Sequence, residues 1–288
     1  MFKGILVIDK EKGRTSRDIV NDIVHKFNIR RVGHTGTLDP LATGVLIVAV
    51  GDACKIIELL TSNDKEYVAE VLVGKETDTL DITGNILKDE KKFFERDKLE
   101  EVLSSFLGEY DQEVPIYSAV HVDGKRLYEY ARNNESVELP KRKVSIKDIE
   151  LLDVFESDGY QHFSFRVSVS KGCYIRSLIR DIGYKLDCPL TMANLRRVRQ
   201  GIFTIDKSKK VSDITPDDLI SMSHALSDIS KVVIDDEVLL KKINNGMKLE
   251  RTIDEMTCFL DSDDELVAIY YPDGNIMRAL KVFPKNNL

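Results

Sequence analysis

Residues 33–44 read Gly33-His34-Thr35-Gly36-Thr37-Leu38-Asp39-Pro40-Leu41-Ala42-Thr43-Gly44, and an unbroken apolar run, Val45–Val50, follows them. The run predicts a buried strand. The three glycines mark positions where the backbone needs a positive φ or the close approach of another group. A polar loop set against a rigid strand often holds catalytic side chains. The spacing alone equally allows a glycine-rich turn in which Asp39 begins an Asp-Pro turn.

The same segment matches a known family motif. Residues 33–46 resemble the signature loop of the TruB family of tRNA pseudouridine synthases, which carries Gly-His-x-Gly-x-Leu-Asp-Pro. In that family the aspartate of the motif is catalytic, so the resemblance implies that Asp39 is the catalytic residue. The stretches 64–84, 114–132 and 170–183 are also similar to the family. The resemblance therefore favours a catalytic loop over a simple turn.

Length and composition indicate an ordinary globular protein. The 288 residues suffice for one large domain, or for one large and one small domain. With 42% hydrophobic and 32% charged residues the chain is not a disordered polymer. No stretch approaches the roughly 18 apolar residues of a membrane span, and the apolar part of residues 1–9 is too short for a signal peptide. We therefore expect a cytoplasmic protein with no membrane contact.

The sequence contains no motif for a metal or a nucleotide cofactor. The four cysteines lie far apart without a Cys-x-x-Cys pair, so neither a zinc site nor a disulfide framework is predicted. Gly74-Lys75 lacks the remaining residues of a phosphate-binding loop, and the glycines of the signature segment do not fit Gly-x-Gly-x-x-Gly. We expect no metal and no cofactor.

The charge is unevenly distributed along the chain. The formal net charge of −7 argues at first sight against a nucleic-acid partner. Residues 162–203, however, hold eight Lys or Arg against two Asp. A second basic cluster, residues 141–143 with Lys147, follows Lys125, Arg126 and Arg132. Local positive fields of this kind engage phosphates even on an acidic protein. Each cluster alone is equally consistent with a solvated surface.

Local patterns predict a mixture of strands and helices. Thr15 or Ser16 caps an amphipathic helix that runs to Phe27, and strict alternation predicts a strand over 163–169. The other expected elements are strands at 4–9, 45–50 and 64–74, a short helix after residue 52, helices at 97–106 and from Gly172, and a β-hairpin around a turn at 272–275.

The resemblance implies an α+β fold with the mixed, mainly antiparallel sheet of the pseudouridine synthases, flanked by helices. Residues 1–230 would form the catalytic domain, with a thumb-like insertion at about 110–147. Residues 231–288 would form a small β domain that is similar to the PUA type of RNA-binding domain. Any small β-barrel would show much the same pattern in this last segment.

The resemblance also assigns supporting residues to the site. Tyr67 would stack on the target base, Arg176 would pair with the aspartate and Leu195 would line the base pocket. Lys10 would support the site electrostatically, although the proline that usually follows this lysine in the family is Glu11 here. Without the resemblance, Tyr67 would be a core residue and Lys10 a surface lysine.

Residues 125–132 combine basic side chains with Tyr128 and Tyr130, and basic residues interleaved with aromatic ones suit RNA binding. His34 would occupy the space that a flipped base vacates, and the alternative for it is a turn-stabilising role. The other expected RNA contacts are Lys125, Arg126, Arg132, Lys141, Arg142, Lys171, Arg180 and Arg196.

The resemblance implies a tRNA pseudouridine synthase that binds the T-arm stem-loop and isomerises the T-loop uridine at position 55. The reaction breaks and re-forms a glycosidic bond after the base has flipped, and it needs no cofactor. We expect a monomer. Two alternatives stay open: a related synthase guided by small RNAs, and a non-catalytic RNA-binding protein or tRNA folding chaperone.

Overall fold

The structure is a computed structural model that describes residues 3–284, so residues 1–2 and 285–288 of the expected domains lie outside the described part. The first half of the chain forms β1 (Gly4–Lys10), α1 (Ser16–Phe27), β2 (Val32–Thr35), β3 (Thr43–Val50), η1 (Gly51–Ile56), α2 (Ile57–Thr61), β4 (Lys65–Val73), β5 (Lys75–Thr77), β6 (Ile86–Asp89), α3 (Arg96–Ser104), β7 (Gly108–Glu113), β8 (His121–Val122), β9 (Lys125–Arg126) and α4 (Leu127–Arg132). The second half forms β10 (Lys141–Ser157), β11 (Tyr160–Val169), α5 (Ile175–Leu186), β12 (Leu190–Gln200), β13 (Phe203–Thr204), η2 (Ile205–Lys207), η3 (Pro216–Asp218), α6 (Met222–Ala225), β14 (Ser230–Val233), α7 (Glu237–Asn244), β15 (Leu249–Glu250), β16 (Thr257–Leu260), β17 (Leu266–Asp273) and β18 (Ile276–Val282).

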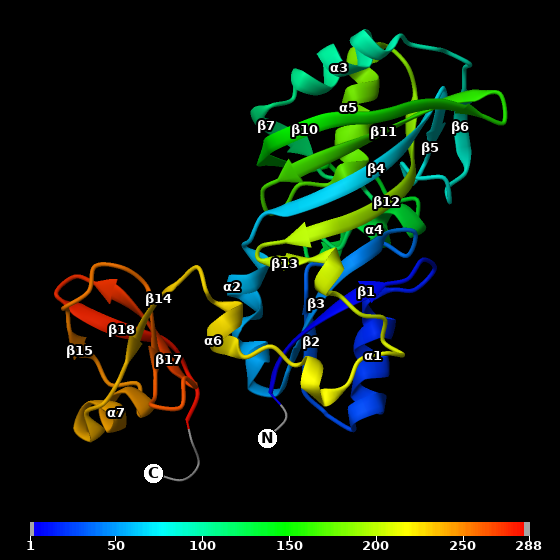
Figure 1. Cartoon of the computed structure of the whole chain (residues 1–288). Coiled ribbons are helices and arrows are strands. Elements are labelled where there is room, and N and C mark those ends of the chain that lie inside the picture. The colour runs from blue at the N-terminus through cyan, green and yellow to red at the C-terminus, as the bar shows by residue number, and fades with distance from the viewer. Residues whose placement is uncertain (1–2, 285–288) are drawn as a thin grey trace.

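One large sheet dominates the molecule (Figure 1). Its strands follow the order β1-β3-β12-β4-β11-β10-β7, with β2 paired to β3 and β13 paired to β12. The pair β12–β3 is parallel, and the other pairs along this order are antiparallel. The expected mixed, mainly antiparallel sheet is therefore confirmed.

The strand β3 is buried on both faces, which explains its unbroken apolar sequence. Leu46, Val48 and Val50 pack into a core beneath α1, α3 and α5. The alternate residues Val45, Ile47 and Ala49 pack on the opposite face with η1, α2 and α6. The strand β4 instead alternates strictly between buried and half-buried residues, because only one of its faces is covered.

A second, five-stranded sheet in the order β14-β16-β17-β18-β15 follows the large one, and α7 packs on it. Cys258, Leu260 and Phe283 of this part belong to the same apolar cluster as Ile47 of β3. Figure 1 shows this second body beside the lower half of the large sheet, next to α2 and α6. The two bodies are thus joined by a shared core, and the RNA-binding class of the second body stays a prediction.

The segment between β7 and β10, residues 114–140, leaves the large sheet. It carries the β8–β9 hairpin and α4. The expected thumb range of about 110–147 also includes residues of β7 and β10, which pair with each other inside the sheet. The excursion itself therefore consists of residues 114–140.

Two helix starts show how local and tertiary signals compete. The α1 helix begins as expected, because Thr15 and Asp18 form a reciprocal capping box. The α5 helix was expected from Gly172 but begins at Ile175. Gly172 has a φ of +87° and Tyr174 is extended, so the chain turns before the helix starts. Capture of the Tyr174 backbone by another strand explains this delay, as described below.

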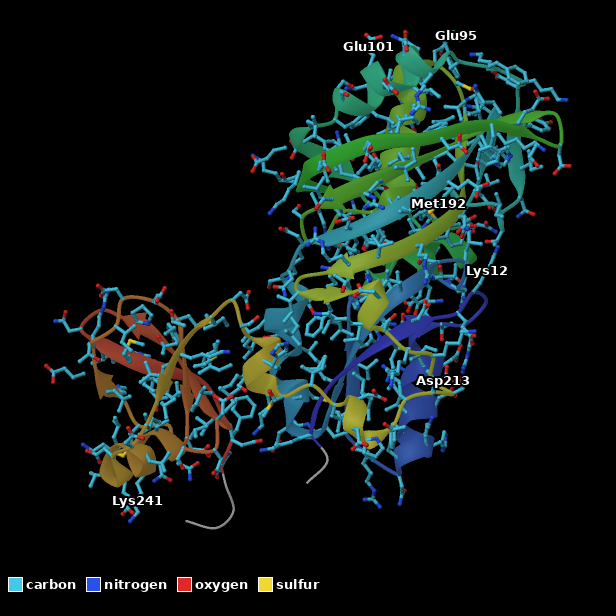
Figure 2. All side chains as sticks on the ribbon, viewed as in Figure 1. Lys12, Glu95, Glu101, Met192, Asp213 and Lys241 are labelled. Carbon is cyan, nitrogen blue, oxygen red and sulfur yellow. The ribbon has the colours of Figure 1, made fainter. Side chains whose placement is uncertain are left out.

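Figure 2 shows side chains on the outside of the molecule and within the large sheet. Figure 2 shows Glu95 and Glu101 at the outer edge, and Met192 lies within the sheet, where it is fully buried. No helix within residues 3–284 is long and apolar enough to cross a membrane.

Gly44→Ala tests how closely β3 and β12 must approach. Gly44 has a φ of +99°, and a Cβ there would lie 2.2 Å from the Arg197 carbonyl oxygen of β12. Gly13 has a φ of +84° with open space around it. We expect Gly13→Ala to cost only the backbone strain of about 1–2 kcal/mol and Gly44→Ala to cost about 1–3 kcal/mol more. Urea denaturation of both variants measures the difference, and equal losses would contradict the close approach.

Candidate active site

A cavity of about 490 Å³ opens beside the loop that precedes β3. Five of the residues expected in the site line it: Asp39, Tyr67, Lys171, Arg176 and Leu195. Asp39 lies in a loop, Tyr67 and Leu195 lie on two strands of the sheet, Lys171 lies in the turn before α5, and Arg176 lies in the first turn of α5. The excursion 114–140 contributes Tyr117, Ser118, Ala119 and Tyr128 to the same lining.

The Asp39 carboxylate is held by the Arg176 guanidinium. Arg176 Nε lies 2.9 Å from Asp39 Oδ2, and the two side chains are 6% and 35% exposed respectively. The other two nitrogens of Arg176 donate to backbone carbonyls, Nη1 to Thr79 at 3.1 Å and Nη2 to Tyr117 at 3.0 Å. The arginine is therefore fixed on three sides, while the carboxylate keeps one part open to the cavity.

The loop that carries Asp39 is held from below by α1 and β1. Ser16 Oγ accepts from the Leu38 N–H at 2.9 Å and donates to the Leu38 carbonyl at 3.2 Å. Lys10 is completely buried, does not line the cavity, and donates to the carbonyls of Glu11, Arg14 and Pro40. Burial lowers the pKa of Lys10 to about 8, against the opposing effect of the Asp39 charge. Lys10 thus fixes the backbone next to Asp39.

Tyr67 and Leu195 form the wall of the cavity. Tyr67 lies opposite Arg197 in the β4–β12 pairing, and Leu195 lies opposite Ala69. Arg197 is 1% exposed and donates from Nε to the Val45 carbonyl at 2.7 Å and from Nη2 to the Gly36 carbonyl at 3.2 Å. Burial raises the pKa of the Tyr67 hydroxyl, and the Arg197 cation opposes part of that rise.

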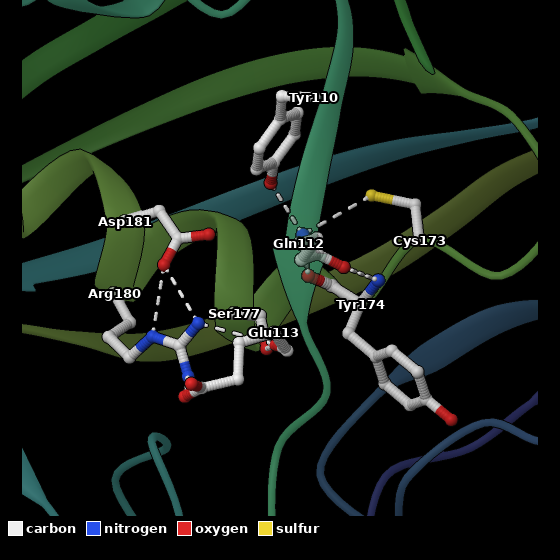
Figure 3. Close-up of polar contacts among 8 residues, drawn as sticks. All are labelled: Tyr110, Gln112, Glu113, Cys173, Tyr174, Ser177, Arg180 and Asp181. Atoms are coloured by element: carbon white, nitrogen blue, oxygen red, sulfur yellow. Dashed lines mark hydrogen bonds and ion pairs between the residues drawn. The ribbon is translucent and has the colours of Figure 1, made fainter. Parts of the chain in front are cut away.

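Gln112 of β7 fixes the segment that leads into α5 (Figure 3). Its Oε1 accepts from the Tyr174 N–H at 2.7 Å, and its Nε2 donates to the Tyr174 carbonyl at 3.1 Å. Ser177 donates to the carbonyl of the neighbouring Glu113 at 2.8 Å. Arg176 lies between these two anchors, so β7 determines where the guanidinium points.

The basic residues expected to bind RNA lie at three kinds of place. Lys171 lines the cavity, and Lys141 and Arg142 are exposed at the start of β10. Lys125, Arg126 and Arg132 belong to the excursion, where the two arginines flank the Tyr128 ring at 5.9 and 5.3 Å. The remaining residues lie away from the cavity lining: His34 in β2, Arg180 in ion pairs with Glu113 and Asp181, and Arg196 paired with Asp9.

No group of three or more His, Cys, Asp or Glu side chains is arranged to hold a metal ion in the part of the chain from 3 to 284. The four cysteines are free thiols. The cavity lining includes a carboxylate, several cations and tyrosine rings, which suit a charged organic substrate with a planar part.

Comparisons with known proteins identify the family of this chain. Residues 24–175, more than half of the chain, match the family model described as TruB family pseudouridylate synthase (N terminal domain). The chain belongs to the TruB family. It is 39% identical to the tRNA pseudouridine synthase B of Lactobacillus acidophilus over 99% of this chain and 100% of the relative. It is also 39% identical to the enzyme of the same name from Staphylococcus aureus, over 94% of each chain.

Two solved structures share the fold of this TruB family member. One is that of an H/ACA RNP bound to a substrate RNA containing 2′-deoxyuridine, with a TM-score of 0.74, 25% identity and coverage of 99% of this chain and 86% of the other. The second is a Cbf5-Nop10-Gar1 complex, with a TM-score of 0.74, 26% identity and coverage of 98% and 85%.

Sequence reasoning missed two cations that line the cavity, Lys65 and Arg197. Both could have been identified from the alternation of side chains along a strand, because residues two positions apart lie on the same face. Lys65 lies two residues before Tyr67 on β4, and Arg197 lies two residues after Leu195 on β12, so each shares a face with a residue already expected in the site. Burial, and then the charges of Arg197 and Lys171, lower the pKa of Lys65 to about 8, while Asp64 acts in the opposite direction.

Gln112→Leu tests the anchor of α5. Loss of the amide leaves the N–H and carbonyl of Tyr174 without this partner, which we expect to lower the free energy of unfolding by about 2–3 kcal/mol. Gln161→Leu is a matched control, because Gln161 holds the Phe94 backbone in the same way, at 2.9 and 2.8 Å. Hydrogen exchange should accelerate at residues 174–176 only in Gln112→Leu. Unchanged exchange there would contradict the anchoring role.

Lys65→Met tests the burial of a charge at the cavity. Below pH 8 Lys65 is charged in both the folded and the unfolded state, so the cost of burying the charge is fully present. Between about pH 8 and the ordinary value of 10.5 only the folded state releases the proton, and stability rises with pH. We expect the free energy of unfolding of the native protein to increase relative to that of Lys65→Met by up to about 3 kcal/mol over this range.

The measurement is urea denaturation of both proteins at several pH values from 7 to 10. The equally low pKa of Lys10 is common to both proteins and cancels in the difference. A constant difference across this range would contradict the lowered pKa of Lys65.

Proposed function

We propose that this protein is a tRNA pseudouridine synthase that isomerises the T-loop uridine at position 55. The relatives that match nearly its whole length are named tRNA pseudouridine synthase B. The observation that carries the proposal is the Asp39–Arg176 ion pair at 2.9 Å in a cavity walled by Tyr67 and Leu195. Its volume of about 490 Å³ lies within the roughly 300–1,000 Å³ that is typical of small-molecule sites.

The reaction is an isomerisation that is balanced within the substrate. The N1–C1′ bond of the uridine breaks, the base turns, and C1′ joins C5. The proton of C5 is lost and N1 gains one, so no oxidant and no group donor takes part. Asp39 supplies the carboxylate that the bond-breaking step requires, either as a nucleophile whose bond to the uridine forms and is broken again before C1′ joins C5, or as an anion that stabilises positive charge on the sugar. Arg176 orients this carboxylate.

The base must leave its stack before it can react, at a cost of a few kcal/mol. A ring surface of Tyr67 in the cavity offsets part of that cost, since base–aromatic stacking is worth about 1–3 kcal/mol. Leu195 supplies an apolar wall beside the ring. The excursion 114–140, with Tyr128 between two arginines, is proposed as the thumb that closes on the stem-loop.

The residues outside the cavity extend the proposal to the whole tRNA arm. Lys141 and Arg142 are exposed on the strand that follows the excursion, where they suit contact with backbone phosphates. The second sheet, from Ser230 to Val282, is proposed as a PUA-like RNA-binding domain. The proposal includes action as a monomer on free tRNA in the cytoplasm.

A guide-RNA-dependent reaction is the less favoured alternative, as is a purely RNA-binding or chaperone role. One related structure is an H/ACA RNP bound to a substrate RNA and another is a Cbf5-Nop10-Gar1 complex, but the relatives with the higher identity carry the tRNA enzyme name. Activity on bare tRNA, without a guide RNA, supports the proposal over both alternatives.

The decisive experiment uses unmodified tRNA with tritium at C5 of its uridines, because joining C1′ to C5 expels that label. We expect the native protein to release one uridine equivalent per tRNA. Asp39→Asn should lower the rate at least about a thousandfold while it retains tRNA binding. Asp22→Asn is the matched control, because Asp22 forms a half-exposed ion pair with Arg14, and its rate should not change. Full activity in Asp39→Asn would exclude the proposed role of that residue.

A further inference from the structure

Three cations gather at one part of the cavity lining. Lys65 comes from the start of β4, Arg197 from β12, and Lys171 from the turn before α5. Lys65 and Arg197 are 7% and 1% exposed, while Lys171 is exposed. We call these three residues the cation cluster. None of them belongs to the Asp39–Arg176 pair.

The two buried members of the cluster are held by carbonyls and not by carboxylates, within residues 3–284. Lys65 Nζ donates to the carbonyls of Thr61 at 3.0 Å and Asn63 at 2.8 Å. Arg197 donates to the carbonyls of Val45 and Gly36. Asp64 acts on the charge of Lys65, but its carboxylate forms an ion pair with Lys147. Two of the three N–H donors of Lys65 and two of the five of Arg197 are used on these carbonyls.

This arrangement is electrostatically unfavourable in the free protein. A buried charge without an opposite charge costs several kcal/mol. Here burial, and then the like charges of Arg197 and Lys171 at the same cavity, hold the pKa of Lys65 well below its ordinary value. A lysine that served only to cap the Thr61 carbonyl at the end of α2 would gain nothing from the neighbouring Arg197 and Lys171. The cluster is therefore suited to an anion that enters with the substrate.

The position of the cluster identifies the anion. Lys65 and Tyr67 lie two residues apart on the same face of β4, about 7 Å along the strand. Gly36 belongs to the loop that carries Asp39, and a Cβ there would lie 3.6 Å from Lys65 Cε and 3.7 Å from Arg197 Nη1. The loop therefore passes directly beside the two buried cations. A nucleotide whose base lies on Tyr67 brings its flanking phosphates into this neighbourhood.

We propose that Lys65, Lys171 and Arg197 form a subsite for one backbone phosphate directly adjacent to the flipped uridine. The inference rests on the proposed function, since it takes the substrate to be an RNA strand. Its ligand is a phosphodiester of that strand. The phosphate replaces the missing counter-ion, so the flipped nucleotide is bound at its base by Tyr67 and at its backbone by the cluster.

The test combines a change in the RNA with a change in the protein. The probe is a T-arm stem-loop in which one of the two phosphates flanking the target uridine is replaced by an uncharged methylphosphonate. The dissociation constant and the single-turnover rate are measured for the native protein and for Lys65→Met on native and substituted RNA. Lys98→Met is the matched control, because Lys98 is an exposed lysine of α3 whose ion pair is with Glu101.

We expect one of the two replacements to weaken binding to the native protein about tenfold. Lys65→Met should bind the native RNA about tenfold less tightly and should no longer distinguish the two RNAs. Its plot of log K against log salt should be shallower by about 0.7, as for one lost phosphate contact on a single strand. Lys98→Met should behave as the native protein does.

Several outcomes would overturn the proposal. The first is that the methylphosphonate replacement weakens binding to Lys65→Met as much as it weakens binding to the native protein. The second is that neither replacement weakens binding to the native protein. The third is that Lys65→Met loses rate while its RNA binding is unchanged, which would assign the lysine to proton transfer. If Lys65→Met does not fold, Lys171→Met provides the same comparison with an exposed residue and should lose most of the sensitivity. Failure of the proposed function is separate, because it appears as absent turnover of unsubstituted RNA by the native protein.

Discussion

The guanidinium of Arg176 is the group on which the geometry of the site depends. Its three nitrogens contact Asp39 in the loop before β3, Thr79 in the turn between β5 and β6, and Tyr117 in the excursion. A planar fork with five donors can satisfy three directions at once, whereas the ammonium of a lysine cannot match this geometry. The carboxylate, the turn and the excursion are therefore positioned by one side chain.

This shared contact couples parts of the chain that are distant in sequence. Because Arg176 is almost fully buried, withdrawal of the Tyr117 carbonyl would leave one of its donors without that partner. The position of the excursion and the orientation of Asp39 are thus linked energetically. The backbone on either side is held separately, by Gln112 at Tyr174 and by Ser16 at Leu38, so the pair itself cannot drift.

Much of the fold could be predicted from local patterns, because the relevant forces are local. The apolar run of β3 and the capping box of α1 express burial and backbone satisfaction within a few residues. The start of α5 could not, since the Gln112 amide that captures Tyr174 lies about sixty residues earlier in the chain. Strand pairing decides such contacts, and no local pattern contains them.

The same distinction applies to the site. The pairing of Arg176 with Asp39 followed from the family resemblance, and the structure contains that ion pair, while the catalytic role of Asp39 stays a proposal. Of the adjacent arginines of β12, sequence reasoning selected Arg196, which faces Asp9, whereas Arg197 shares the cavity with Leu195. Side chains alternate between the two faces of a strand, so Arg196 and Arg197 lie on opposite faces. Which of them faces the cavity can be predicted only when the face of a nearby residue, here Leu195, is known. The strand β3 also connects the two bodies of the molecule. Its one face supports the core beneath the cavity and its other face joins the second sheet, so core packing fixes the distance between the two bodies. A substrate of fixed shape that contacts both bodies would require such a rigid connection.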